Sequence, residues 1–292
     1  METDNNRKTF SGKLFKDVDH FVNDDGQYLF YKTWKPENPV EFLLCVVHGF
    51  GGHVVRFDEL SSHVNSIGGL AFGNDHVGHG ESEGSRTTTH DYNVIIRDFI
   101  QLTEKMKKEY PDVPVFIYGQ SMGGALSVLA ACDKPELFKG IITVGGMFVK
   151  DPALQSPIKK VLLQFASAIV PNLQVTNLTD NKSTRDEVEK EKSLSDPLKN
   201  SVVKCQMAYQ LLRIMEKIEE IMPTLKIPFL AMHGDADTTC SLEGSKNLHK
   251  VAQSEDKTLK IYKDCCHDLI HEIQPDRDQC FEDIRLWLKE HI

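Results

Sequence analysis

Ser121 is the residue whose type and setting best fit a nucleophile, because it is the centre of a Gly-x-Ser-x-Gly pattern at 119–123. Four apolar residues at 115–118 precede the pattern, as in a short buried strand, and an uncharged run of good helix formers follows at 125–131. A strand, a sharp turn and a helix are the setting of a nucleophile elbow, which holds the serine hydroxyl out at the top of a sheet. The helix N-terminus favours negative charge there. The sequence therefore predicts acyl transfer through Ser121.

A second copy of the pattern, at 80–84, is centred on Ser82. Two glutamates flank this serine, and no apolar helical run follows it. Their charge would oppose the oxyanion that forms when a hydroxyl attacks an ester carbonyl. We therefore expect Ser82 to be an unreactive residue of a surface loop.

A serine nucleophile needs a base, and the base needs a carboxylate that orients it. In an open parallel sheet such groups belong at the carboxyl ends of strands. The expected strand at 228–232 is followed by Asp235 and Asp237, and the expected strand at 258–262 is followed by His267. The chain order Ser, Asp, His is that of the α/β-hydrolase layout. We assign His267 as the base and Asp237 as its partner, with Asp235 as the second choice.

The oxyanion formed in acyl transfer needs two N–H donors. One is expected from Met122, which follows the nucleophile, and the other from an early loop of His-Gly type. The loop at 48–51 fits, with Phe50 as the first choice and Gly51 as the alternative.

Strand and helix patterns alternate along most of the chain. The expected strands are 42–47, 70–72, 115–118, 140–149, 228–232 and 258–262, and the expected helices are 90–109, 125–131, 242–252 and 280–288. An alternating stretch at 13–35 with an Asp-Gly turn predicts an antiparallel edge. This order predicts an α/β fold with a mainly parallel central sheet flanked by helices.

Residues 150–224 interrupt this alternation. They hold no good strand pattern, and amphipathic helix signals at 158–170 and 202–221 are separated by a polar stretch at 177–192. We therefore expect a core formed by residues 1–149 and 225–292, with 150–224 inserted into it as a helical block.

Composition excludes several classes of function. The 292 residues carry a net charge of −9 without a basic stripe, which argues against a nucleic-acid partner. The polar N-terminus lacks the apolar region of a signal peptide, and no apolar run is long enough to span a membrane. The seven scattered cysteines form no CxxC pair, so we expect a reduced, cytoplasmic protein without a disulfide framework or zinc site.

From about residue 20 to its end, the chain resembles the monoacylglycerol lipases of the α/β-hydrolase fold. The resemblance is carried by short strings at 48–53, 75–84, 114–116, 121–124, 195–198, 236–237 and 259–262. The string Asp-His-Val-Gly-His-Gly-x-Ser-Glu-Gly at 75–84 is much more specific than Gly-x-Ser-x-Gly. The resemblance implies a Ser121, Asp237 and His267 triad, oxyanion donors at Phe50 and Met122, and a cap at 150–224 over an acyl tunnel.

One face of the first cap helix is apolar, with residues Ile158, Val161, Leu162, Phe165, Ala168 and Ile169 recurring at helical spacing. Such a face can line the tunnel, lie on a membrane surface or pack on the core. A peripheral membrane contact through the cap is therefore one of three interpretations.

The chain departs from the family where glycerol is held. Gln120 replaces the usual histidine before the nucleophile, and Gly52, Ser193 and Ile270 replace polar residues of well-known members. Arg56 is retained and is our one predicted substrate-binding residue. A cysteine near the acid, Cys240, is interpreted as inert packing in preference to a reactive thiol.

We predict a serine hydrolase that cleaves monoacylglycerol to fatty acid and glycerol through an acyl-enzyme, with no metal or organic cofactor. The alternative is a lysophospholipase or another long-chain carboxylesterase with the same triad. The alternative from another class is a non-catalytic, lipid-binding member of the fold. The intact triad argues against it, because a binding protein has no need to keep all three residues. A carboxylate nucleophile is disfavoured because the elbow holds serine.

Overall fold

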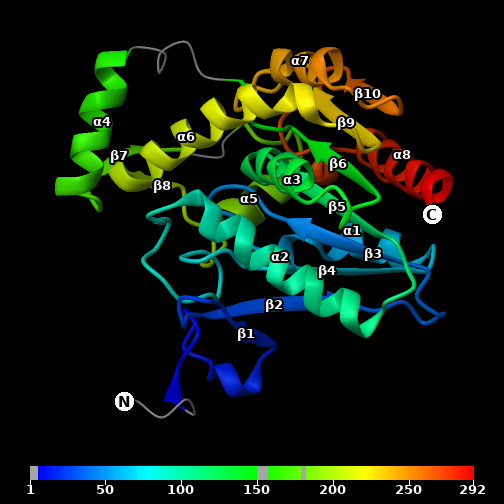
Figure 1. Ribbon diagram of the computed structural model, residues 1–292, viewed down its shortest axis with the longest axis horizontal. Helices are drawn as coiled ribbons and strands as arrows, with labels where there is room; N and C mark the ends of the chain where they lie inside the picture. The colour runs from blue at the N-terminus through cyan, green and yellow to red at the C-terminus, as the bar shows by residue number, and fades with distance from the viewer. Residues whose placement is uncertain (1–5, 150–156, 179–181) are drawn as a thin grey trace.

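The main sheet of the computed structural model, which describes residues 6–149, 157–178 and 182–292, has eight strands in the order β1-β2-β4-β3-β5-β6-β9-β10 (Figure 1). The strands are β1 (His20–Val22), β2 (Tyr28–Trp34), β3 (Phe42–Val47), β4 (Gly69–Asn74), β5 (Val115–Gln120), β6 (Gly140–Val144), β9 (Phe229–Gly234) and β10 (Lys257–Tyr262). Strand β2 runs antiparallel to β1 and β4, and the other neighbours are parallel. The predicted α/β fold and its antiparallel edge are confirmed.

Helices cover both faces of this sheet because successive strand residues enter two different apolar cores. In β3 the even-numbered residues from Phe42 to Val46 face one core, and the odd-numbered residues from Leu43 to Val47 face the other. The helices that share the core of Leu43 include α2 (Tyr92–Glu109), α3 (Met122–Asp133) and α7 (Leu242–Val251). The helices that share the core of Phe42 include α1 (Asp58–Asn65) and α8 (Asp276–His291).

Strand β6 is shorter than its apolar run predicts. The run extends over 140–149, but the strand ends at Val144. Gly145 follows with a φ of 55°, in the left-handed region that glycine adopts most readily, and the chain turns out of the sheet. A Cβ on Gly145 would lie 2.9 Å from Nδ1 of His267, so the turn also leaves room for that ring.

The predicted insertion is not entirely helical in the structure. Its described elements are α4 (Pro157–Ile169), β7 (Gln174–Asn177), α5 (Glu187–Ser195), β8 (Val202–Lys204), α6 (Cys205–Ile221) and the 3-10 helix η5 (Met222–Thr224). Strands β7 and β8 form a separate two-stranded antiparallel sheet, so the expectation of no strand in this block is wrong. The side chains of β7 are exposed, so no buried apolar run marked it in the sequence.

In Figure 1, α4, β7 and β8 stand beside one end of the main sheet, and α6 runs from them towards α3. The predicted block also contains 150–156 and 179–181, which lie outside the described residues. Across the described ranges, no helix has the length and apolar character needed to cross a bilayer.

Candidate active site

Strand β5 and helix α3 meet at Ser121 in a strained turn. Ser121 has φ 56° and ψ −121°, outside the regions that non-glycine residues favour, and such a conformation costs about 1–3 kcal/mol. Glycine is required on both sides because a Cβ at Gly119 would collide with the carbonyl of Gly123, and one at Gly123 with that of Val47. Ser121 is the N-cap of α3 and Met122 its first residue, so the unpaired N–H groups of a helix N-terminus lie beside the hydroxyl.

The structure brings His267 and Asp237 together, since Nδ1 of His267 lies 2.7 Å from Oδ2 of Asp237. Oδ1 of Asp237 accepts hydrogen bonds from the backbone N–H groups of Thr239 (2.7 Å) and Cys240 (2.9 Å). A buried ring missed in the sequence, His233 at the end of β9, lies 3.1 Å from the same Oδ2. Burial opposes ionisation of Asp237, but hydrogen bonds from His233 and His267 hold the pKa of this carboxyl well below its usual range.

The second-choice acid lies elsewhere. Asp235 is exposed, and its Oδ1 accepts a hydrogen bond from the backbone N–H of Asp264 at 2.6 Å. It therefore supports the turn after β10, while the side chain of Asp237 is fully buried against the histidine.

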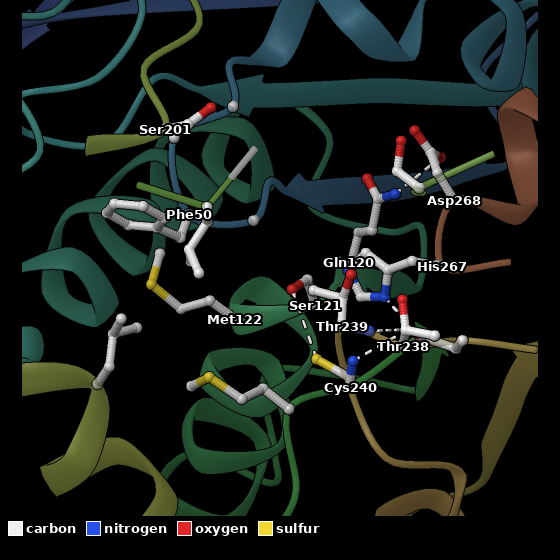
Figure 2. Close-up of a pocket in the computed structure, with 18 of the residues that line it drawn as sticks. Phe50, Gln120, Ser121, Met122, Ser201, Thr238, Thr239, Cys240, His267 and Asp268 are labelled. Atoms are coloured by element: carbon white, nitrogen blue, oxygen red, sulfur yellow. Dashed lines mark hydrogen bonds and ion pairs between the residues drawn. The ribbon is translucent and has the colours of Figure 1, made fainter. Parts of the chain in front are cut away.

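A cavity of about 1640 Å³ opens beside Ser121. His267, Phe50 and Met122 also line it, so the predicted nucleophile, base and oxyanion donors share one space (Figure 2). Gly49 brings the loop of Phe50 against the elbow, since a Cβ there would lie 3.0 Å from the Cβ of Ser121. Typical small-molecule sites occupy about 300–1,000 Å³. The cavity is therefore large enough for a long acyl chain.

Three buried histidines support the loop that carries Phe50, a role that the sequence did not reveal. Nε2 of His48 accepts a hydrogen bond from the backbone N–H of His76 at 3.0 Å, and the two rings stack with centroids 3.7 Å apart. The ring of Phe50 meets His79 edge-on at 5.9 Å. Burial lowers the pKa of His76 to about 3 and that of His79 to about 4, so both rings are neutral at pH 7.

Ser82 is not a surface residue, and that expectation is wrong. Its side chain is buried, donates a hydrogen bond to the carbonyl of Asp75 at 2.7 Å and accepts one from the backbone N–H of Phe30 at 2.9 Å. Its neighbour Glu81 is also buried, because the backbone N–H and the hydroxyl of Ser11 both donate to its carboxylate. The second Gly-x-Ser-x-Gly copy is thus a packed structural loop.

One end of the cavity is polar. Nε2 of Gln120 donates to Oδ1 of Asp268 at 2.8 Å, and Nδ1 of His271 lies 2.8 Å from Oδ2. Arg56, the predicted substrate-binding residue, lines the cavity with its Nη2 3.9 Å from Asp268 Oδ2. Ile270 turns away into a core, and its neighbour His271 faces the cavity instead. The roles of Asp268 and His271 were not predicted, because Asp268, which His271 contacts, meets Gln120 and Arg56 only in the folded chain.

Lys199 adds a cation to this end, and it too was missed. It lines the cavity, and its Nζ donates a hydrogen bond to the hydroxyl of Ser193. Burial lowers the pKa of Lys199 to about 8. The charge of Asp268 opposes this shift, and the charge of Arg56 adds to it. For Asp268, burial is outweighed by the charges of His271 and Arg56, which hold the pKa of the carboxyl well below its usual range.

Cys240 lies close to the nucleophile, with its Sγ 3.8 Å from Oγ of Ser121 (Figure 2). Burial and the nearby charge of Asp237 raise the pKa of its thiol to about 12. A buried, protonated thiol is a poor nucleophile, which agrees with the interpretation of Cys240 as packing.

Comparison with known proteins identifies the family. The sequence profile of the serine aminopeptidase S33 family matches residues 38–274. The monoglyceride lipase of Rattus norvegicus is 36% identical over 292 residues, which are 100% of this chain and 96% of the rat protein. This chain belongs to the monoglyceride lipase family of serine hydrolases. The Homo sapiens member of that family is 35% identical over 97% of this chain and 94% of its own length.

Solved structures share the fold of this monoglyceride lipase family member. A soluble variant of monoglyceride lipase from Saccharomyces cerevisiae, in complex with a substrate analog, has a TM-score of 0.83 at 23% identity and covers 94% of both chains. The monoacylglycerol lipase of Paleococcus ferrophilus has a TM-score of 0.81 at 23% identity, covering 90% of this chain and 99% of its own. The predicted α/β-hydrolase fold is thus confirmed.

Proposed function

We propose that this protein hydrolyses the ester bond of monoacylglycerol and releases a fatty acid and glycerol. The observation that carries the proposal is the 2.7 Å approach of His267 to Asp237 in a family member whose large cavity is also lined by Ser121. The rat and human relatives, both monoglyceride lipases, support the choice of substrate.

In the proposed reaction, His267 takes the proton of the Ser121 hydroxyl as its oxygen attacks the ester carbonyl carbon. The backbone N–H groups of Phe50 and Met122 stabilise the oxyanion. The bond to glycerol breaks, and His267 returns the proton to the departing oxygen. A water that His267 deprotonates then attacks the acyl-enzyme, and His267 passes that proton to the Ser121 oxygen as the fatty acid leaves. Asp237 stays ionised and stabilises the imidazolium.

Release of oleate and glycerol from 1-monooleoylglycerol by the purified protein tests this proposal, with lysophosphatidylcholine and p-nitrophenyl decanoate assayed beside it. If a fluorophosphonate labelled the protein but monooleoylglycerol was not hydrolysed, the protein would be a carboxylesterase with a different substrate. No labelling of folded protein would point to the non-catalytic, lipid-binding alternative.

We infer that the polar end of the cavity binds the two free hydroxyls of the glycerol head. Asp268 supplies an acceptor there, while Arg56 and Lys199 supply donors. This mixture of signs suits a neutral diol. The rat and human monoglyceride lipase relatives support the same choice of head group. Monoacylglycerol is therefore favoured over lysophosphatidylcholine.

Replacing Lys199 by methionine is expected to lower kcat/KM for 1-monooleoylglycerol about tenfold, because a hydrogen bond from a charged group contributes roughly 1.5–3 kcal/mol. The kcat/KM for p-nitrophenyl decanoate, whose leaving group has no hydroxyl chain, is expected to change less than about twofold on the same reasoning. Steady-state kinetics on both esters measure the difference.

Lys204→Met is the matched control, because Lys204 donates to the carbonyl of Arg86 and is absent from the cavity lining. Equal losses on both esters in Lys199→Met, or equal effects of the two lysine variants, would contradict a head-group role for Lys199.

We propose that the outer face of α4 rests on a lipid surface. Leu162, Phe165 and Ile169 are 63%, 63% and 76% exposed, whereas Leu163 between them lines the cavity. Exposure argues against the two other interpretations of this apolar face, tunnel lining and core packing, for these three residues. The side chain of Ile158 lies outside the described residues. Large exposed apolar side chains on one helix face are typical of interfacial helices.

The double variant Phe165→Glu/Ile169→Glu is expected to bind phospholipid vesicles at least about tenfold more weakly, because each buried CH₂ contributes about 0.8 kcal/mol to lipid association. Hydrolysis of vesicle-borne monooleoylglycerol should fall in parallel, while hydrolysis of dispersed p-nitrophenyl butyrate stays unchanged. Leu286→Glu, on the exposed face of α8, is the control. Vesicle sedimentation that is unaffected by the double variant would contradict the α4 contact.

We also infer a reducing compartment such as the cytoplasm. All seven cysteines are free, and five of them are buried: Cys45, Cys205, Cys240, Cys265 and Cys280. Free buried thiols of this number are usual where thiols stay reduced.

A further inference from the structure

Three consecutive residues of the inserted block, 183–185, lie against the loop that carries His267. The carbonyl of Ser183 accepts a hydrogen bond from the backbone N–H of Asp268 at 2.7 Å. The hydroxyl of Thr184 donates to the carbonyl of His271 at 2.7 Å. Both Ser183 and Thr184 are buried. The segment after His267 is thus fixed by a piece of chain that precedes α5.

The third residue, Arg185, reaches the other side of the same loop. Its Nε donates to Oε2 of Glu272 at 2.9 Å, and its Nη2 donates to Oδ2 of Asp276 at 2.5 Å. Oε1 of Glu272 accepts the backbone N–H of Cys266 at 2.7 Å. Since Cys266 directly precedes His267, one carboxylate joins Arg185 to the backbone just before the proposed base.

Glu272 is fully buried, so its charge needs a compensating cation. Arg185 is the cation that contacts it, and the bidentate reach of guanidinium to two carboxylates explains why arginine suits this position. Loss of Arg185 would leave a buried carboxylate to protonate or to draw in water. Either change alters the acceptor that fixes Cys266, and hence the backbone from which the His267 ring projects.

We propose that Arg185, from the inserted block, and Glu272, from the core, are positioning residues that hold His267 against Asp237 on the side of the cavity that Ser121 lines. The proposal rests on the proposed function in that His267 is taken as the base. Residues 183–185 lie between β7 and α5, so the block that covers the cavity also aligns the catalytic histidine.

The test is the kinetics of Arg185→Gln and Arg185→Lys. Loss of a residue that orients a reacting group typically costs 10–100-fold, and we expect a fall of about that size in kcat for Arg185→Gln with KM within about twofold. Arg185→Lys should recover part of the loss. In Arg185→Ala, millimolar guanidinium should restore kcat, because the side chain is 29% exposed and its site is therefore reachable. Arg213→Gln is the control, since Arg213 has 34% exposure and pairs with Asp91 outside the cavity.

A second readout is the low-field proton NMR resonance of the His267–Asp237 hydrogen bond. It should shift or broaden in Arg185→Gln and remain as in wild type in Arg213→Gln. The resonance is measured without substrate, so it tests the positioning of His267 independently of the proposed function. If the wild-type protein turned over no monoacylglycerol, the proposed function would be contradicted, but the comparison of resonances would still test the role of Arg185. Wild-type kcat and an unchanged resonance in Arg185→Gln would overturn the proposal. So would a loss of kcat that guanidinium fails to restore and that matches the loss of folded protein.

Discussion

Replacing Ser121 by alanine is expected to lower kcat for 1-monooleoylglycerol by about 10⁴–10⁶-fold, because no other group can form the acyl-enzyme. The remaining activity would come from binding and from the proposed oxyanion donors acting on water. Fluorophosphonate labelling should disappear completely. The fold should be kept, since the hydroxyl of Ser121 faces the cavity and lies 3.8 Å from the Sγ of Cys240. Labelling and initial-rate assays on the folded variant measure both effects.

Ser82→Ala is the matched control, because it changes the serine of the other Gly-x-Ser-x-Gly pattern. This hydroxyl bridges Phe30 and Asp75 in a buried loop, and a buried polar group left unsatisfied costs about 1–3 kcal/mol. We expect a lower Tm with full fluorophosphonate labelling, the opposite of the pattern for Ser121→Ala. Labelling that survives in Ser121→Ala and vanishes in folded Ser82→Ala would reverse our assignment of the nucleophile.

The elbow was predictable because its determinants are local. A buried strand, two glycines with no room for a Cβ and a helix of small apolar residues lie within 115–131, so the sequence alone contains the turn. The approach of His267 to Asp237 is not local. It was predictable because parallel strands deliver their carboxyl ends to one edge, and β9 and β10 are neighbours there.

The head-group end was not predictable, because its residues meet only in the folded chain. Lys199 follows α5, Asp268 follows the base, and no spacing in the sequence relates them. The orientation of Ile270 and His271 depends on a short 3-10 helix, Leu269–His271, that directs one side chain to the core and the next to the cavity. Burial of Ser82 likewise depends on its hydrogen bonds with Phe30 and Asp75, which are 52 and 7 positions away from it in the sequence.

Replacing Asp237 by asparagine is expected to lower kcat by about 10⁴-fold with little change in the fold. Two backbone N–H groups, of Thr239 and Cys240, donate to Oδ1 and so fix which atom of the new amide faces them. The amide nitrogen must then take the place of Oδ2 and donate to Nδ1 of His267. The ring is forced into the tautomer with its proton on Nε2, which has no lone pair to accept the proton of Ser121.

The same variant distinguishes the two acids that follow β9. Asp235→Asn keeps an acceptor for the N–H of Asp264 and leaves the hydrogen bond of His267 intact, so its kcat should stay within about twofold of wild type. Raising the pH should not restore Asp237→Asn, because an asparagine amide has no proton to lose that would recreate the carboxylate acceptor. A 10⁴-fold loss in Asp235→Asn, or near-normal turnover in folded Asp237→Asn, would contradict the assignment of Asp237 as the partner of His267.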